Sequence, residues 1–482
     1  MRIEDYLEKE YGYDKSVKTR WDRYIALWRS WYMGKVKAFH NYTIYNGQKN
    51  VQCTRQSMQM AKKICEDWAD LLFNERCKIT VKEKSSQDQL EEILDDMDFY
   101  DFINESIERS GAMGTGAVIV SVQNLNVDEE SGIIDITESE PAIEYVDVEW
   151  IFPISWTGKK ITECAFGAKR TIKGKEYILL SIHHKAANGE YIISNRAFLF
   201  KNGNITEVQQ DESIDDFNTQ SDIPWFVILS PAGNNNIAPD LPWGLSYFAN
   251  AIDDLKACDI GFDGFVNEVI LGRKRIFARA EMMQVDPNGI EKPTFDPNDM
   301  SVYVLPNGFN KDDLLQTDAS NIRSADFVSY LRTSLSMLSS KVGMGKDHYD
   351  FDPVNLTTAT QVVSQNSQLF RRKKKHENRL ESALYDLIQA IAYAASTFSR
   401  YSISTEGLVI AFDDSIIEDK EAIANRSMRE VSAGVLSDVE YRMKVFGETE
   451  AVAKKKIQEI KDAQAAEEPE PFGAGGSGGD EK

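Results

Sequence analysis

One long stretch of this chain lacks the residues that most often interrupt a helix. Residues 357–400 contain neither glycine nor proline. In the second half of the stretch, apolar residues recur at helical spacing. They are Leu380, Leu384, Leu387, Ile391 and Ala394. The pattern predicts a single helix longer than most helices of globular proteins, along which other parts of the chain can pack.

Two more long helices are predicted before it, with a small insert between them. Residues 244–271 and 320–342 repeat apolar residues at the spacing of one buried helix face. Residues 272–319 contain the strand-like runs "RKRIFA" and "SVYVLP" among loops. The acidic residues of the first helix lie outside its apolar stripe, which suggests neighbours along only one side. These acidic residues are Asp253, Asp254, Asp259 and Asp263.

The segment "GMGKDHYDFDPVNL", residues 343–356, separates the second of these helices from the third. Its glycines, proline and aspartates predict a loop. The run "GMGKD" resembles a phosphate-binding loop, but the earlier glycine is missing, and Asp347 stands where a Ser or Thr would hold magnesium. The sequence therefore predicts no nucleotide site here.

The first 243 residues combine helices with strands. Helices are expected over 15–40, 54–75 and 88–110, and Trp21, Trp28 and Trp31 of the first are expected to anchor a core.

From 116 to 225, short β-rich runs alternate with turn residues, which predicts an α+β fold class. His183 and His184 are adjacent in one of these runs. Their side chains would point to opposite faces of a strand, so we do not expect them to share a metal ion.

Charge and cysteine usage exclude several classes of protein. The chain has 77 acidic and 55 basic residues, a net charge of -22, which is the opposite of a tight nucleic-acid binder. No apolar run of about eighteen residues occurs, so neither a membrane span nor a secretion signal is expected. No catalytic motif, cofactor motif or metal-ligand spacing was found, and we expect no enzymatic activity. The cysteines, expected to be reduced, are Cys53, Cys65, Cys77, Cys164 and Cys258.

The C-terminal part separates into two segments. Residues 417–465 have a helical pattern, with a break and restart marked by Gly434 and Ser437. Residues 466–482 are rich in acidic residues and glycine, and we expect them to be disordered.

The order of these parts resembles that of tailed-bacteriophage portal proteins, over about residues 1–465. The matching runs are "MAKKICEDWADLLFNE", "PWGLSYFANAIDDLKACDIGFDGFVNEV" and "TATQVVSQNSQLFRRKKKHENRLESAL". The resemblance implies an α+β portal fold with a mixed α/β wing, two long stem helices, a small β-containing clip, a long kinked spine helix and a helical crown. In order along the chain it places the wing at 1–243, completed by 401–416, the stem helices at 244–271 and 320–342, the clip at 272–319, the tunnel loop at 343–356, the spine at 357–400 and the crown at 417–465.

The resemblance also implies a function and a set of partners. Portal proteins form a homo-oligomeric ring, normally a dodecamer, at one capsid vertex, and double-stranded DNA passes through its channel without sequence specificity. The implied protein partners are the terminase large subunit, which supplies the packaging ATPase, a head-completion or adaptor protein, and the major capsid and scaffolding proteins. The implied location is the virion, and the host cytoplasm during assembly. An alternative is another head–tail connector or scaffold-like virion protein that does not enclose DNA.

Two groups of candidate site residues follow from this resemblance. The tunnel loop would line the channel, with mobility from its glycines and weak attraction of DNA phosphates by its few cations. The loop residues are Gly343, Gly345, Lys346, Asp347, His348, Tyr349 and Asp350. A basic run follows in the spine, Arg371, Arg372, Lys373, Lys374 and Lys375. The run is either a solvated or subunit-interface face, or a DNA contact; five cations over more than one turn do not share one face, which favours the first interpretation.

Overall fold

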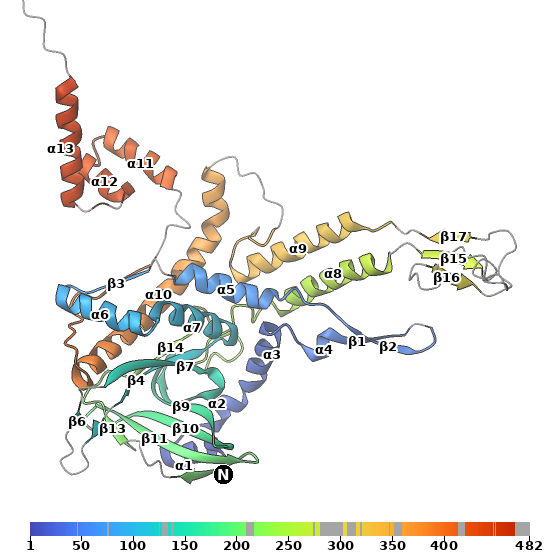
Figure 1. Cartoon of the computed structure of the whole chain (residues 1–482), viewed down its shortest axis with the longest axis horizontal. Helices are drawn as coiled ribbons and strands as arrows, with labels where there is room; N and C mark the ends of the chain where they lie inside the picture. Colours follow the sequence, from blue (N-terminus) through green and yellow to red (C-terminus); the bar gives the residue numbers. More distant parts are fainter. Residues whose placement is uncertain are drawn as a thin grey trace, which may run out of the picture. The chain divides into compact units, whose positions relative to one another are not determined.

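The computed structural model describes residues 1–45, 47–74, 77–124, 126–127, 134–135, 139–208, 216–272, 275–279, 302–305, 315–318, 321–346, 348–350, 359–412, 420–446, 448 and 450–467. The chain divides into two compact units. The first comprises Met1–Pro353 and Ser367–Asp413, and the second comprises Val354–Asn366 and Asp414–Lys482. Both helices and strands are abundant (Figure 1), which confirms the α+β class.

The N-terminal helices are shorter and more numerous than the sequence pattern predicted. Residues 15–40 form three helices instead of one, and Gly34, with a positive φ of 66°, separates the second of them from the third. Residues 88–110 belong to two helices separated at Asp98, which also has a positive φ. The helices of this part are α1 Ile3–Tyr11, α2 Lys15–Thr19, α3 Asp22–Tyr32, α4 Lys37–His40, α5 Met60–Leu72, α6 Lys84–Asp96 and α7 Phe99–Met113.

The two largest antiparallel sheets of the first unit lie in its N-terminal part. A six-stranded sheet has the order β12-β11-β10-β9-β8, with β13 also paired to β11, and a three-stranded sheet has the order β14-β4-β7. The strands are β4 Gly116–Gln123, β7 Glu140–Asp147, β8 Ile151–Thr157, β9 Lys160–Ile172, β10 Lys175–Lys185, β11 Tyr191–Lys201, β12 Asn204–Val208, β13 Asp216–Asn218 and β14 Phe226–Leu229; β5 Asn126–Val127 and β6 Ile134–Asp135 form a separate pair, and η1 Val148–Trp150 is a short 3₁₀ helix.

The predicted separation of the two adjacent histidines is confirmed within β10. The His183 side chain is buried beside Phe166 and Phe226, whereas His184 contacts Ser194 and Tyr11. Burial lowers the pKa of His183 to about 3, so it is neutral at ordinary pH.

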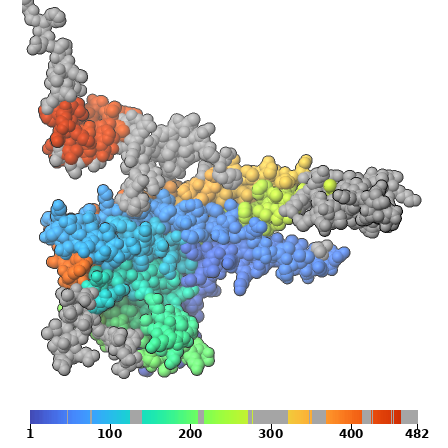
Figure 2. Space-filling model, in the orientation of Figure 1, coloured from blue at the N-terminus to red at the C-terminus, as the bar shows by residue number. Residues whose placement is uncertain are grey.

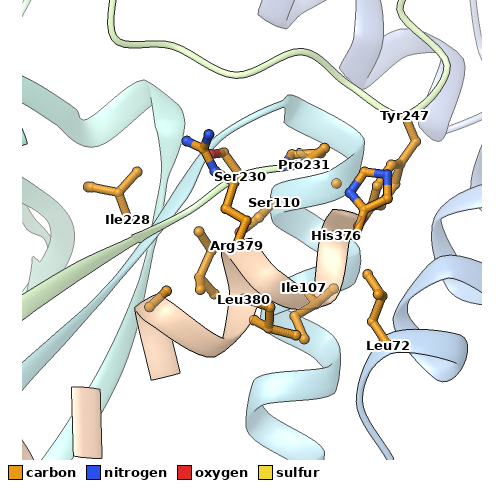
Figure 3. Close-up of a pocket in the computed structure, with 13 residues that line it drawn as sticks. Leu72, Ile107, Ser110, Ile228, Ser230, Pro231, Tyr247, His376, Arg379 and Leu380 are labelled. Carbon is orange, nitrogen blue, oxygen red and sulfur yellow. The ribbon is translucent and has the colours of Figure 1, made fainter. Parts of the chain in front are cut away.

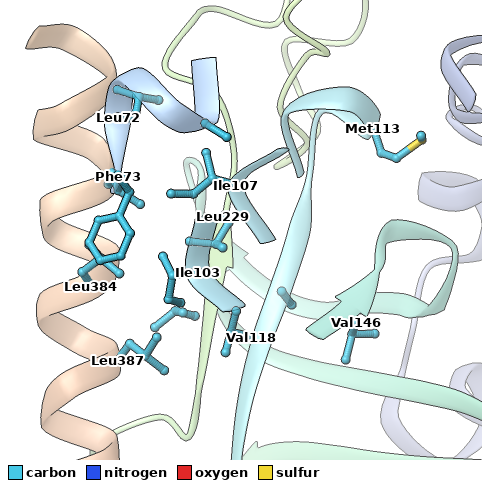
Figure 4. Packing of buried hydrophobic residues seen from close by; sticks show 14 of the residues in the cluster. Leu72, Phe73, Ile103, Ile107, Met113, Val118, Val146, Leu229, Leu384 and Leu387 are labelled. Carbon is cyan, nitrogen blue, oxygen red and sulfur yellow. The ribbon is translucent and has the colours of Figure 1, made fainter. Parts of the chain in front are cut away.

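Buried apolar side chains form a large core between the helices and the three-stranded sheet. Figure 4 shows Ile103 and Ile107 of α7 between Leu384 and Leu387 of the long helix on one side and the sheet residue Val118 on the other. Trp21, Trp28 and Trp31 are buried in the same core, as predicted. A smaller core joins α1 to the six-stranded sheet through Tyr6 and Phe198, among others.

Two long helices, α8 Ile252–Leu271 and α9 Ser324–Val342, pack side by side (Figure 1). The approach is close: a Cβ on Gly261 would lie 2.5 Å from the Tyr330 ring. At the far ends of the pair, Arg323 forms two hydrogen bonds of 3.0 Å with Glu268.

The predicted start of the first long helix at Gly244 is wrong, because residues before Ile252 are held in a non-helical conformation by α7. The Tyr247 amide donates to the Gly111 carbonyl, and the Gly244 amide donates to the Thr115 hydroxyl. A Cβ on Gly244 would lie 2.3 Å from the Gly114 carbonyl oxygen. This close backbone packing takes the place of helical hydrogen bonds. The second helix likewise begins at Ser324 rather than at 320.

A two-stranded hairpin, β1 Asn41–Tyr45 and β2 Asn50–Thr54, lies beside α8 (Figure 2). It corrects the expectation that α8 has neighbours along only one side. Asp259 and Asp263 are buried, and they accept hydrogen bonds from residues that flank or form the hairpin. Polar residues on this face of α8 are therefore partnered rather than solvated.

Three strands are described within 272–319: β15 Arg275–Arg279, β16 Val302–Leu305 and β17 Leu315–Asp318. β15 pairs in parallel with β16 and antiparallel with β17. The first two coincide with the predicted strand-like runs. The rest of the insert lies outside the described residues.

The longest helix, α10 Ala359–Phe398, is continuous, as predicted from its lack of glycine and proline. Its predicted kink stays a prediction. After it, β18 Val409–Ala411, within the segment 401–416, pairs with β3 Lys78–Thr80 of the N-terminal part. The segment after the long helix thus pairs with a strand of the N-terminal part.

The second unit contains α11 Lys420–Ser432, α12 Asp438–Phe446 and α13 Glu450–Glu467. The predicted helix break is confirmed: Gly434 has a φ of 68°, and Ser437 and Glu440 exchange hydrogen bonds at the start of α12. The expected disorder of the tail concerns residues that, beyond Glu467, lie outside the described part of the chain.

Candidate functional site

The first part of the candidate channel loop is the capped end of α9. Gly343 follows the last helical residue with a φ of 91°. Its amide donates to the Ser340 carbonyl at 3.2 Å, and the Met344 amide donates to the Ser339 carbonyl at 3.0 Å. This pair of bonds is a Schellman motif, which requires a left-handed residue at the Gly343 position. A Cβ there would also lie 2.8 Å from Cγ of Arg372 in α10.

The next residues, Met344 and Gly345, are held against the end of α9. Gly345 has a φ of 92°, and its carbonyl accepts a hydrogen bond from the Ser339 hydroxyl. Met344 is buried, and so are both glycines. The two glycines were expected to make the loop mobile. Over 343–345 the structure corrects that reason: they permit a tightly bonded turn that other residues would strain.

The second part of the loop is tied to α5 by one carboxylate. His348 Nε2 lies 3.7 Å from Asp67 Oδ2, and Lys63 Nζ lies 2.6 Å from Asp67 Oδ1. Burial acts to raise the pKa of Asp67, but contacts with His348, Lys63 and Tyr349 outweigh it, so the pKa lies below its ordinary value. For Tyr349, burial and then the charge of Asp67 raise the pKa well above its ordinary value. Asp67 therefore organises two loop residues at once.

Asp350 ties the loop back to α9. Arg332 Nη2 lies 2.8 Å from Asp350 Oδ2, and Arg332 Nε lies 3.3 Å from the same oxygen. Lys341, near the end of α9, contacts Asp254 of α8 at 2.7 Å. The described part of the loop is thus held by contacts with both α5 and α9.

Lys346 is the exception within the loop. Its side chain is exposed and forms no hydrogen bond or ion pair with the described residues. Asp347 and residues 351–358 lie outside the described part of the chain. Lys346 is consequently a cation presented to solvent by an anchored backbone.

The basic run of α10 does not form one face, as its spacing predicted. Lys373 is buried and pairs with the buried Glu377 at 2.6 Å, while Arg371, Arg372, Lys374 and Lys375 are exposed. A second contact, of 3.4 Å, joins Lys374 to Glu377. Removing Lys373 would leave the buried Glu377 carboxylate with only the longer contact to the exposed Lys374, so Lys373 has a structural part whatever its exposed neighbours bind.

Several residues that position the loop were missed by sequence reasoning. They are Asp67, Ser339 and Arg332, which hold it, and Gln368 of α10, which donates to the Ser340 carbonyl at 3.0 Å. No local motif identifies them, because each contributes one ordinary polar side chain from a helix.

The described residues include no cluster of His, Cys, Asp and Glu side chains arranged to hold a metal ion. Nor is any described helix long and apolar enough to span a membrane.

Comparison with known proteins gives a match to a family and likenesses to solved structures. A chain from the neck of a native GTA particle computed with C12 symmetry has 10% identity and a TM-score of 0.40, with 80% of this chain and 89% of that chain covered. That likeness is too low to support an argument. Comparison with curated protein sequences gave no match. The family described as "Phage portal protein, SPP1 Gp6-like" matches residues 14–470, nearly the whole chain, and this protein belongs to that family of phage portal proteins.

Proposed function

We propose that this chain assembles into a closed homo-oligomeric ring, a dodecamer, at one capsid vertex, and that double-stranded DNA enters and leaves the capsid through its channel. Family membership over residues 14–470 is the observation that carries this proposal. In the ring, α8 and α9 form the stem, residues 272–319 form the clip, α10 forms the spine and α11–α13 form the crown. The ring belongs to the virion and assembles in the host cytoplasm.

The loop 343–356 faces the channel in this proposal, and Lys346 meets DNA. Three features support it: the loop follows the end of α9, its described part is anchored, and the exposed Lys346 has no partner among the described residues. A single exposed cation contributes about 1 kcal/mol or less. The chain as a whole is strongly acidic, which disfavours firm attachment of DNA. A channel lined by so acidic a chain lets the duplex slide.

Imaging and cross-linking test this together. Electron microscopy of the purified protein should show rings with a central hole; filaments or monomers would contradict the ring. A Lys346→Cys variant carrying a photoactivated cross-linker should attach to DNA stalled during packaging. Lys201→Cys, on an exposed strand end of the wing, is the matched control and should attach to none. The native cysteines are buried or half-buried, which keeps the background low. Equal cross-linking from both positions would contradict the channel assignment.

The clip docks the terminase large subunit during packaging and the head-completion protein afterwards, while the wing and crown meet the major capsid and scaffolding proteins. The argument is positional, since the clip is the insert between two long helices. Deleting 280–300 should leave rings that cannot package DNA. Normal packaging by that variant would contradict this assignment.

The chain itself hydrolyses no nucleotide, because terminase supplies the ATPase. The family is structural, and the sequence around 343–347 lacks the phosphate-loop pattern. ATP turnover by terminase-free protein that disappears in Lys346→Ala would contradict this.

A further inference from the structure

A small cavity lies between α7, α10 and the segment that follows β14. Its volume is about 30 Å³, enough for a group somewhat larger than one water molecule. Figure 3 shows Arg379 and His376 of α10 and Ser230 at this cavity. The remaining lining is mainly apolar, and no carboxylate belongs to it.

Two polar groups at the cavity, the His376 ring and the Ser230 hydroxyl, have a donor without an acceptor among the described residues. The Nδ1 atom of His376 accepts a hydrogen bond from the Ala232 amide at 2.9 Å, so the neutral ring carries its proton on Nε2. Nε2 is buried and has no partner among the described residues, and the same is true of the Ser230 hydroxyl. His376 is only 3% exposed, packed between Trp68 and Tyr247. An unsatisfied buried donor is unfavourable, so each of these groups favours an acceptor in the cavity.

Positive charge gathers at the same place. The Arg379 guanidinium is half-buried, and no carboxylate of the described residues pairs with it. Lys375 and Lys159 are near, and Lys159 donates to the Gly233 carbonyl at 3.0 Å. Burial lowers the pKa of Arg379, and burial followed by the neighbouring cations lowers the pKa of Lys159. Water satisfies donors but does not offset this charge, whereas an anion does both.

We propose that this cavity binds a monoatomic anion, chloride in solution, held by the Arg379 guanidinium, the His376 Nε2–H group and the Ser230 hydroxyl. A space this small suits one such ion better than a large polyatomic anion such as gluconate. The ion links α10 to the segment after β14 and so stabilises the junction of the long helix with the sheet. This site is independent of the proposed channel and needs no DNA.

Two measurements on the full-length protein test the proposal. The melting temperature should rise with chloride concentration when sodium gluconate keeps the ionic strength constant, because an ion that binds only the folded chain stabilises it by mass action. The ³⁵Cl resonance should broaden in the presence of the protein. In Arg379→Met, chloride affinity should fall about tenfold or more, since a charge-assisted hydrogen bond is lost. Arg371→Met, an exposed cation of the same helix, should behave as the parent protein.

Ser230→Ala provides a second variant that removes one donor and no charge. It should weaken chloride binding by a smaller factor than Arg379→Met, whether or not the latter folds well. The proposal would be overturned if the parent protein showed neither broadening of the ³⁵Cl resonance nor stabilisation by chloride. Broadening that is unchanged in both Arg379→Met and Ser230→Ala would also overturn it.

Discussion

Two histidine–aspartate pairs join distant segments of this chain, and they differ in burial. His40 Nε2 lies 2.9 Å from Asp259 Oδ2, and both side chains are almost fully buried. His348 Nε2 lies 3.7 Å from Asp67 Oδ2, with the histidine side chain 31% exposed. The first pair joins the segment that precedes the hairpin to α8, and the second joins the candidate channel loop to α5.

The surroundings of the two carboxylates explain what each pair does. Asp259 also accepts hydrogen bonds from the Ser57 hydroxyl and the Met58 amide, so its loss leaves the buried His40 and two partly buried donors unpaired. Asp67 is partnered by the exposed Lys63 and the partly exposed His348, and water can replace both contacts. The same two residue types thus form a buried, fully bonded contact at the hairpin and a weaker, partly exposed contact at the loop.

The largest loss of stability is expected from removing the buried carboxylate of Asp259. Asp259→Ala should destabilise the folded protein by about 3 kcal/mol, because it leaves His40, Ser57 and the Met58 amide without their acceptor. Thermal unfolding and hydrogen exchange of residues 41–54 would measure this. Asp253→Ala is the control, since that exposed residue of α8 pairs only with Lys256 in the contacts described. Similar losses in both variants would show that the buried network does not hold the hairpin.

A smaller effect is expected where the loop is held by its backbone. Gly343→Ala should cost about 1 to 2 kcal/mol, because alanine is strained at a φ of 91° and its Cβ meets the Arg372 side chain. Replacing both Gly343 and Gly345 should therefore lower stability as well as impair DNA translocation. Melting curves measure the first effect. Gly233→Ala, at a position with open space and no positive φ, should leave the melting temperature within error of the parent. An unchanged melting temperature in Gly343→Ala would refute the capping argument.

The stability contributed by the contacts of Asp67 with the loop should depend on pH. Asp67→Asn should cost about 1 kcal/mol at pH 7. The pKa of Asp67 is lower in the folded chain than its ordinary 3.8, so its ionised form contributes stability above that pH, and the contribution is lost as the pH falls through the lowered value. The stability difference between parent and variant, from urea unfolding, should therefore shrink as the solution is acidified below about pH 4. A stability difference between parent and variant that stays constant to pH 2 would contradict an ionic contribution from Asp67.

The smallest effect is expected at Lys346, which contacts neither Asp67 nor Asp259. Lys346→Ala should change stability by less than about 0.5 kcal/mol, because the side chain is exposed. DNA packaging should change little, since one transient phosphate contact is lost. A large loss of packaging at normal stability would mean that Lys346 acts on DNA more strongly than an exposed cation does.

Local patterns in the sequence determined the long helices, the α+β class and the helix break near Gly434. These features depend on residues within a few positions of one another, such as the absence of glycine and proline from 357–400 or the capping partners Ser437 and Glu440. Helical and strand periodicities carry that information directly.

The tertiary structure alone decided which polar residues are buried and what they touch. Asp259 and Lys373 read as solvated charges in the sequence, yet both are buried with partners, and α8 begins at Ile252 because α7 holds the residues before it. The partners of Asp259 and of the Gly244 amide come from segments far away in the chain, and hydrogen bonds between such segments leave no periodic trace in the sequence. The candidate loop was recognised from its composition, but its anchoring through Asp67 and Arg332 arises only when α5 and α9 come together.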